Sequence, residues 1–201
     1  MKINFNTSLL IGILLFFIGV KAQVINDSLW IDGHYRSFHF NKPPVSNTKA
    51  SLIFVLHGSG GNGLKSMKSA SKLMALAESE HILMVFPDGY KKNWNECRKN
   101  APAAANVENI DENAFFSQMI DYGVANYKIN PARVFAIGTS GGGHMVYTLA
   151  MTMPEKFKGI TAIVANIPVP DNMDCVEKKM PMPVMIVNGT NDQTNPYNGG
   201  I

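Results

Sequence analysis

A five-residue stretch, Gly138-Thr139-Ser140-Gly141-Gly142, places a serine between glycines. It follows the apolar residues 134–137 directly and precedes an amphipathic helical pattern. Where a strand turns sharply into a helix, a serine on the turn projects its hydroxyl above the sheet, and the flanking positions are too tight for side chains. We therefore predict that Ser140 is a nucleophile; the alternative is an ordinary Gly/Ser turn.

A serine hydroxyl is a poor nucleophile unless a base, an orienter for that base and oxyanion donors surround it. The amide of Gly141 is one predicted donor, and Gly58 or Ser59 supplies the second from the glycine-rich loop 57–61. A phosphate-cradling loop is the alternative for 57–61. The loop lacks the lysine and spacing of a P-loop and the full dinucleotide fingerprint, so we reject a nucleotide site.

An aspartate stands where a triad acid is needed. Asp192 ends the stretch 188–192, directly after a predicted strand that stops at Val187. An acid just past the carboxyl end of a strand lies at the same edge of the sheet as the nucleophile. We predict that Asp192 orients the base. Asp171 and Asp174 are weaker candidates, with turn formation as their alternative role.

The elements that must position these residues alternate between strand and helix. Strand patterns cover residues 34–40, 51–56, 81–86, 133–137, 159–165 and 183–187. Helical spacing covers residues 67–77 and 145–153, and a further helix begins at Asn109, where Glu112 completes a pattern like a capping box. This order predicts an α/β fold with a mostly parallel sheet covered by helices on both faces.

Composition and charge exclude several classes of protein. The chain has 201 residues, 46% of them hydrophobic, which suits one globular domain. The basic residues are scattered, so no nucleic-acid partner is predicted. Too few soft or imidazole ligands lie at close spacing for a metal, and we predict no metal and no cofactor. Cys97 and Cys175 form a disulfide or remain two buried thiols; both alternatives stay open.

The N-terminus reads as a secretory signal. Lys2 precedes an apolar run over residues 9–20, and Ala22 suits signal peptidase. The run is shorter than the roughly 18 residues that a spanning helix needs, so we predict no stable membrane anchor. Residues 1–22 are the predicted signal peptide, and residues 23–201 are one secreted or periplasmic domain. Cleavage would lower the formal charge of +3 to about +1.

The chain from Tyr35 to its end resembles the secreted α/β-hydrolase esterases grouped as polyhydroxybutyrate depolymerases and feruloyl or acetylxylan esterases. The resemblance is carried, in order, by Leu56-His57-Gly58, Phe86-Pro87-Asp88-Gly89, Trp94, Ile110-Asp111-Glu112 and residues 129–134, 138–145, 153–157 and 187–192. It implies an α/β-hydrolase fold, Ser140 as nucleophile and Asp192 as triad acid. The implied substrates are carboxylic esters of plant polysaccharide or polyhydroxyalkanoate.

The resemblance also implies a triad histidine after the acid, in the order Ser, Asp, His. No histidine follows Asp192, and the sequence ends at Ile201. The histidines present are not well placed to replace it: His34, His39, His57, His81 and His144. We therefore expect a C-terminally truncated esterase that lacks its last strand, its base and its final helix. Its activity should be strongly impaired, and a hydrophobic sheet edge should be exposed.

Two other functions remain open from the sequence. A serine peptidase or other acyl transferase would use the same turn, whereas a non-catalytic binding module would retain it only as architecture. Trp94 and Tyr90 lie in the long segment before Asn109. They line a substrate groove or pack in the core.

Overall fold

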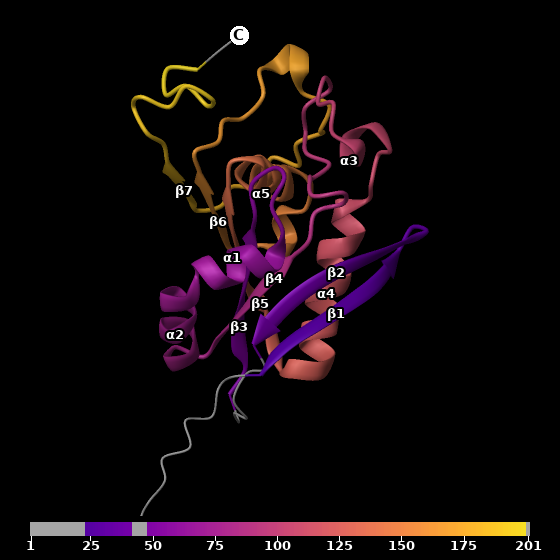
Figure 1. The fold of residues 1–201 in the computed structure, drawn as a ribbon, viewed down its shortest axis with the longest axis vertical. Helices are drawn as coiled ribbons and strands as arrows, with labels where there is room; N and C mark the ends of the chain where they lie inside the picture. The colour runs from indigo at the N-terminus through magenta and orange to yellow at the C-terminus, as the bar shows by residue number, and fades with distance from the viewer. Residues whose placement is uncertain (1–22, 42–47, 200–201) are drawn as a thin grey trace, which may run out of the picture.

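The computed structural model describes residues 23–41 and 48–199, and the predicted signal segment 1–22 lies outside them. The centre of this part is a seven-stranded sheet with the order β1-β2-β4-β3-β5-β6-β7 (Figure 1). The strands are β1 (Val24–Ile31), β2 (His34–Asn41), β3 (Ala50–Leu56), β4 (Ile82–Pro87), β5 (Ile129–Thr139), β6 (Gly159–Ile163) and β7 (Val184–Val187). Strands β4, β3, β5, β6 and β7 run parallel to one another, and β2 is antiparallel to both β1 and β4. The predicted α/β class with a mostly parallel sheet is confirmed.

The helices follow the strands in the predicted alternation. They are α1 (Gly63–Ser69), α2 (Ser71–Ser79), α3 (Ala104–Val107), α4 (Glu112–Tyr127) and α5 (Gly141–Thr152), with short 3₁₀ helices η1 (Pro154–Lys156) and η2 (Pro170–Asn172). The single helix predicted over 67–77 is two helices. They divide at Ala70, which is both the C-cap of α1 and the N-cap of α2.

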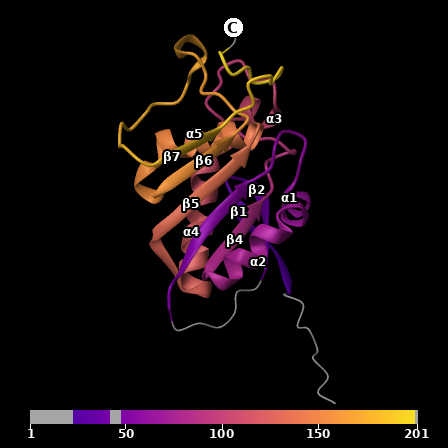
Figure 2. The same ribbon diagram turned by 90° about the vertical axis from the view of Figure 1, so that its left-hand side faces the viewer.

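Helices cover both faces of the sheet, and β3 shows how. Leu52, Phe54 and Leu56 belong to the main core with residues of α4 and α5. Ile53 and Val55 pack instead with the smaller cluster that includes α1 and α2. Because successive side chains of a strand point to opposite faces, the two helix pairs lie on opposite sides of the sheet (Figures 1 and 2).

One local prediction is wrong. Helix α4 does not begin at Asn109, which has φ 49°; it begins at Glu112 after the N-cap Asp111, whose side chain accepts the N–H of Ala114. The Glu112 carboxylate binds Arg36 and Asn95 instead, so no capping box forms.

Strand β1 is not among the predicted strands. Its odd-numbered positions from Ile25 to Ile31 are the more buried ones, as expected for a strand with one covered face. The sequence conceals this alternation because Asp27 occupies one of the inward positions. Its carboxylate accepts a short hydrogen bond from the Tyr122 hydroxyl of α4.

Candidate active site

Ser140 sits at the junction between β5 and α5 in a strained conformation. Its φ of 53° and ψ of −121° are unusual for a residue with a side chain. The Ser140 N–H donates to the carbonyl of Ile163 over 2.9 Å, which fixes the turn to the end of β6. A Cβ atom added at Gly138 would lie 2.0 Å from the carbonyl oxygen of Gly142, so this position admits only glycine. The local geometry is a tight strand-to-helix turn with a serine on it, as the predicted nucleophile requires.

The predicted oxyanion donors lie beside this turn. A Cβ at Gly141 would meet the backbone nitrogen of Ser59 at 3.0 Å and its Oγ at 2.4 Å. A Cβ at Gly58 would lie 3.4 Å from the Cβ of Ser140. The structure therefore brings the loop of Gly58 and Ser59 against the start of α5, where the amides of Ser59 and Gly141 are neighbours.

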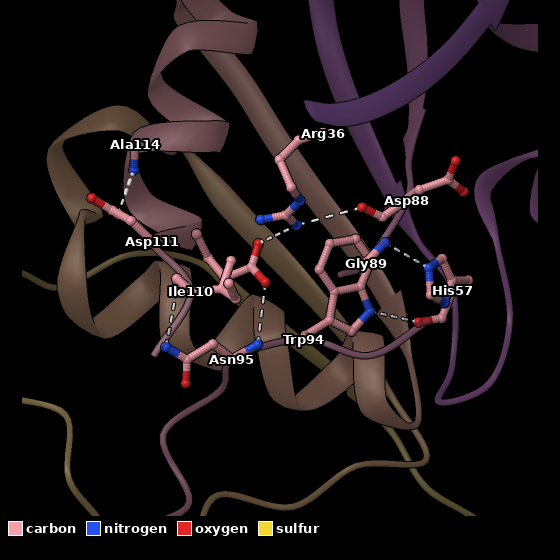
Figure 3. A network of polar contacts seen from close by, with 10 residues as sticks. Arg36, His57, Asp88, Gly89, Trp94, Asn95, Ile110, Asp111 and Ala114 are labelled. Atoms are coloured by element: carbon pink, nitrogen blue, oxygen red, sulfur yellow. Dashed lines mark hydrogen bonds and ion pairs between the residues drawn. The ribbon is translucent and has the colours of Figure 1, made fainter. Parts of the chain in front are cut away.

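His57 holds the glycine-rich loop 57–61 in place through hydrogen bonds of its ring. Its Nε2 accepts the backbone N–H of Gly89 over 2.9 Å (Figure 3). Its Nδ1 lies 2.8 Å from the carbonyl of Gly58. Because an amide only donates and a carbonyl only accepts, the ring is neutral with its proton on Nδ1. Burial lowers the pKa of His57, in agreement with this state. Both ring nitrogens are occupied, so His57 has a structural role here.

Trp94 completes this support. Its indole N–H donates to the carbonyl of His57 over 2.9 Å, and the side chain is 2% exposed (Figure 3). A buried ring has no face free for a substrate, which favours the packing alternative for Trp94. Tyr90 is half-buried, and its hydroxyl donates to Glu108 over 2.7 Å.

A buried ion pair that the sequence did not reveal supports the same region. Arg36 of β2 and Glu112 of α4 are 2.8 Å apart, and their side chains are 2% and 3% exposed. The second oxygen of Glu112 accepts the N–H of Asn95, one residue beyond Trp94 (Figure 3). Burial raises the pKa of Glu112, and Arg36 opposes this effect. The pair thus ties the Trp94 segment to β2 and α4.

Asp88 is a second polar residue that the sequence did not single out for a role. It directly follows β4, and its carboxylate accepts the N–H of Gly63 at the start of α1 over 2.7 Å. The other oxygen lies 2.9 Å from Nε2 of His39. Although burial alone would raise it, the pKa of Asp88 is lowered by these hydrogen bonds. Asp88 therefore joins the end of β4 to α1 and β2.

Asp192 lies in an exposed loop after β7. Its Oδ1 accepts the backbone N–H groups of Thr194 and Asn195, each over 2.8 Å. These bonds lower the pKa of Asp192, which keeps the carboxylate ionised at neutral pH. Its Oδ2 has no hydrogen-bond partner among the described residues, so one oxygen stays available to a base.

Within residues 23–41 and 48–199, no histidine side chain is hydrogen-bonded to the hydroxyl of Ser140. His39 binds Asn26 and Asp88, and His144 binds Asn195. His34 packs its ring against Tyr90 instead. The described site therefore holds the serine turn, the neighbouring amides that are predicted as oxyanion donors, and an ionised aspartate in the loop after β7, without a general base on Ser140 among the described residues.

Cys97 and Cys175 form a disulfide in the structure, which decides between the two alternatives left by the sequence. The bond joins the segment after Trp94 to the loop that follows η2. Among the described residues, no cluster of three or more His, Cys, Asp or Glu side chains is suited to a metal ion. None of the helices described here has the length and apolar character to span a membrane.

Comparison with known proteins adds a family and a set of relatives. Residues 42–201 match the Phospholipase/Carboxylesterase family. Feruloyl esterase B of Neurospora crassa is 31% identical over 117 residues, which are 58% of this chain and 39% of that protein. Poly(3-hydroxyalkanoate) depolymerase C of Paucimonas lemoignei is 27% identical over 175 residues, or 82% of this chain and 42% of that protein. The chain thus spans about two fifths of the length of these relatives.

Solved structures share the fold. A thermostable esterase superposes with a TM-score of 0.67 at 16% sequence identity, covering 88% of this chain and 49% of the esterase. At this level of identity the likeness concerns the fold alone. It supports the α/β-hydrolase type of architecture built here from the strand order and the serine turn.

Proposed function

We propose, from the premise that this chain belongs to the Phospholipase/Carboxylesterase family, that it provides the nucleophile and oxyanion site of a serine-dependent carboxylic-ester hydrolase. The observation that carries the proposal is the strained turn of Ser140 with the amides of Gly141 and Ser59 side by side. A binding protein would gain nothing from a serine whose backbone conformation destabilises the fold.

The chemistry follows from this arrangement. The Oγ of Ser140 attacks the ester carbonyl, and the amides of Gly141 and Ser59 bind the resulting oxyanion. Collapse of the tetrahedral intermediate expels the alcohol and leaves an acyl-enzyme. Water then attacks the acyl group, which releases the acid and restores the serine hydroxyl. A base must carry the proton in each half of the reaction, and Asp192 is the residue proposed to orient it.

The polypeptide of residues 23–201 should be a slow catalyst. Its described histidines are occupied away from Ser140, so proton transfer from the hydroxyl depends on solvent. Loss of the triad base leaves only the contribution of the oxyanion donors and substrate binding, several orders of magnitude below a complete site.

The substrates we propose are esters of hydroxycinnamic or acetic acid on plant polysaccharide, or polyhydroxyalkanoate. The resemblance and the names of the relatives support these classes. We also propose that the protein is exported, with residues 1–22 as its signal. The Cys97–Cys175 disulfide supports an oxidising compartment, because such bonds are rare where thiols are kept reduced.

The test compares three reagents on residues 23–201: p-nitrophenyl acetate, a peptide p-nitroanilide and a fluorophosphonate probe. We expect slow ester hydrolysis that free imidazole accelerates, because imidazole can serve as the absent base. Ser140→Ala should abolish the labelling and lower the hydrolysis to the rate of imidazole without protein, whereas Ser69→Ala, which removes an exposed hydroxyl on α1, should change neither.

The other outcomes identify the competing functions. Cleavage of the anilide alone would point to a peptidase. If Ser140 is not labelled, and the protein adds no hydrolysis to that of imidazole alone, the result would point to a non-catalytic binding module.

A further inference from the structure

His144 connects the helix of the nucleophile to the loop of the acid. It lies one turn beyond Ser140 on α5, and its backbone N–H donates to the Ser140 carbonyl over 2.9 Å. Its side chain reaches Asn195, 51 positions away, where Nε2 lies 3.1 Å from Oδ1. Asn195 is buried although most of the surrounding loop is exposed.

The protonation of His144 fixes the direction of this bond. Burial and the nearby positive charge of Arg98 lower the pKa of His144, so the ring is neutral near pH 7. The amide oxygen of Asn195 accepts, which places the one ring proton on Nε2. Nδ1 is then buried with no hydrogen-bond partner among the described residues. A position that served only packing would favour an apolar side chain, because an unpaired buried nitrogen is costly.

Asn195 makes two hydrogen bonds, one to His144 and one to Asp192. Its side chain accepts from His144, while its backbone N–H donates to Oδ1 of Asp192 over 2.8 Å. His144 is therefore connected to the predicted acid, Asp192, through one intermediate residue, Asn195. A further anchor of the loop is the side-chain amide of Asn166, which donates to the Pro196 carbonyl over 3.1 Å.

We propose that His144 is a positioning residue that sets Asp192 relative to Ser140 through Asn195. The role of this tether in catalysis rests on the proposed function, whereas the tether itself does not. His144 does not act as the base, because its protonated nitrogen is directed to Asn195 and α5 carries it one turn from the nucleophile. It couples the strained serine turn to the loop that carries Asp192.

The first experiment measures hydrogen exchange in residues 188–199 and the tautomer of His144. Nitrogen NMR should find the proton on Nε2. His144→Leu and Asn195→Ala each remove the bond, and each should speed exchange of the loop amides about tenfold while the core of the sheet is unchanged. The double variant should add nothing, and His144→Gln, which retains a donor, should recover part of the protection. Thr152→Val is the matched control, because it removes a hydroxyl hydrogen bond from the same helix away from the loop.

The second experiment measures ester hydrolysis with free imidazole as base. We expect His144→Leu to lower kcat by about 10- to 100-fold with KM unchanged, as small displacements of catalytic groups do, and to resemble Asp192→Asn. Unchanged loop exchange in His144→Leu, additive effects in the double variant, or full activity in His144→Leu when Asp192→Asn is impaired would each overturn the proposal. If Asp192→Asn has no effect, the acid assignment fails, and the tether is judged by exchange alone.

Discussion

Ser140 holds a backbone conformation that costs roughly 1–3 kcal/mol in a residue with a side chain. Gly141 approaches Ser59 closely, and we propose that the two amides bind the oxyanion formed when the Ser140 hydroxyl attacks. A single added methyl group therefore tests the site without touching the nucleophile.

Gly141→Ala should lower the reactivity of Ser140 toward a fluorophosphonate by about 10²-fold or more, as loss of an oxyanion donor does. The new Cβ would lie 2.4 Å from Oγ of Ser59, which must rotate, and 3.0 Å from the Ser59 backbone nitrogen, which must shift away from Gly141. Gly189→Ala is the control, because its Cβ would meet nothing within 4 Å. Equal labelling rates in both variants would remove Ser59 from the site.

The His57 ring makes the free energy of unfolding of the protein dependent on pH. Burial lowers the pKa of His57 in the folded state below the 6.5 of the unfolded chain, so the unfolded state binds the proton first as pH falls. The free energy of unfolding should therefore decrease from pH 6.5 downward until the folded-state pKa is passed, by at most about 1.4 kcal/mol per pH unit from this group.

Urea unfolding of the wild type and of His57→Gln between pH 5 and 8 checks this slope. The difference between the two proteins isolates His57 from His144, whose pKa is also lowered. A difference that does not vary with pH would contradict the assigned neutral ring.

At the scale of elements, β2, α4 and the Trp94 segment are joined by the buried Arg36–Glu112 pair. The Arg36 guanidinium also lies 4.3 Å from the centre of the Phe115 ring. Because both charges are removed from water, each depends on the other for compensation.

Arg36→Met should destabilise the fold by about 3–5 kcal/mol, because it leaves the Glu112 carboxylate buried and unpaired. Arg36→Met combined with Glu112→Leu should recover most of that loss. Lys91→Met, which breaks an exposed pair with Glu108, should cause no measurable change. The measurement is the free energy of unfolding in urea; a double variant as unstable as Arg36→Met would contradict the argument.

At the scale of the whole molecule, the described part of the sheet has an apolar edge at β7. This strand pairs only with β6 within the described residues (Figure 1). Its residues are 42–60% exposed. Unpaired backbone groups flanked by apolar side chains favour pairing with another chain.

Residues 23–201 should therefore self-associate as concentration rises, and Ile186→Lys on β7 should shift the protein to monomer in light scattering. Val176→Lys is the matched control, since it places the same charge on an exposed apolar position outside the strands. Association that persists in Ile186→Lys and disappears in Val176→Lys would place the contact elsewhere.

The sequence by itself determined the strand-to-helix turn at Ser140, the glycine-rich loop and the order of most strands and helices. These features depend on residues that are close together in the sequence, because a turn or a strand is specified by the spacing of residue types over a few positions. It missed β1, where Asp27 interrupts the alternation, and misplaced the start of α4, because Asn109 and Asp111 are both good caps.

Only the tertiary structure decided the His57 tautomer, the Arg36–Glu112 pair, the disulfide and the His144–Asn195 bond. Their partners lie 32, 76, 78 and 51 positions apart. No local pattern selects such partners, because a buried polar group is satisfied by whichever chemistry the fold brings within hydrogen-bond distance. The chemistry of the serine is thus local, while the placement of everything that would support it is a property of the whole fold.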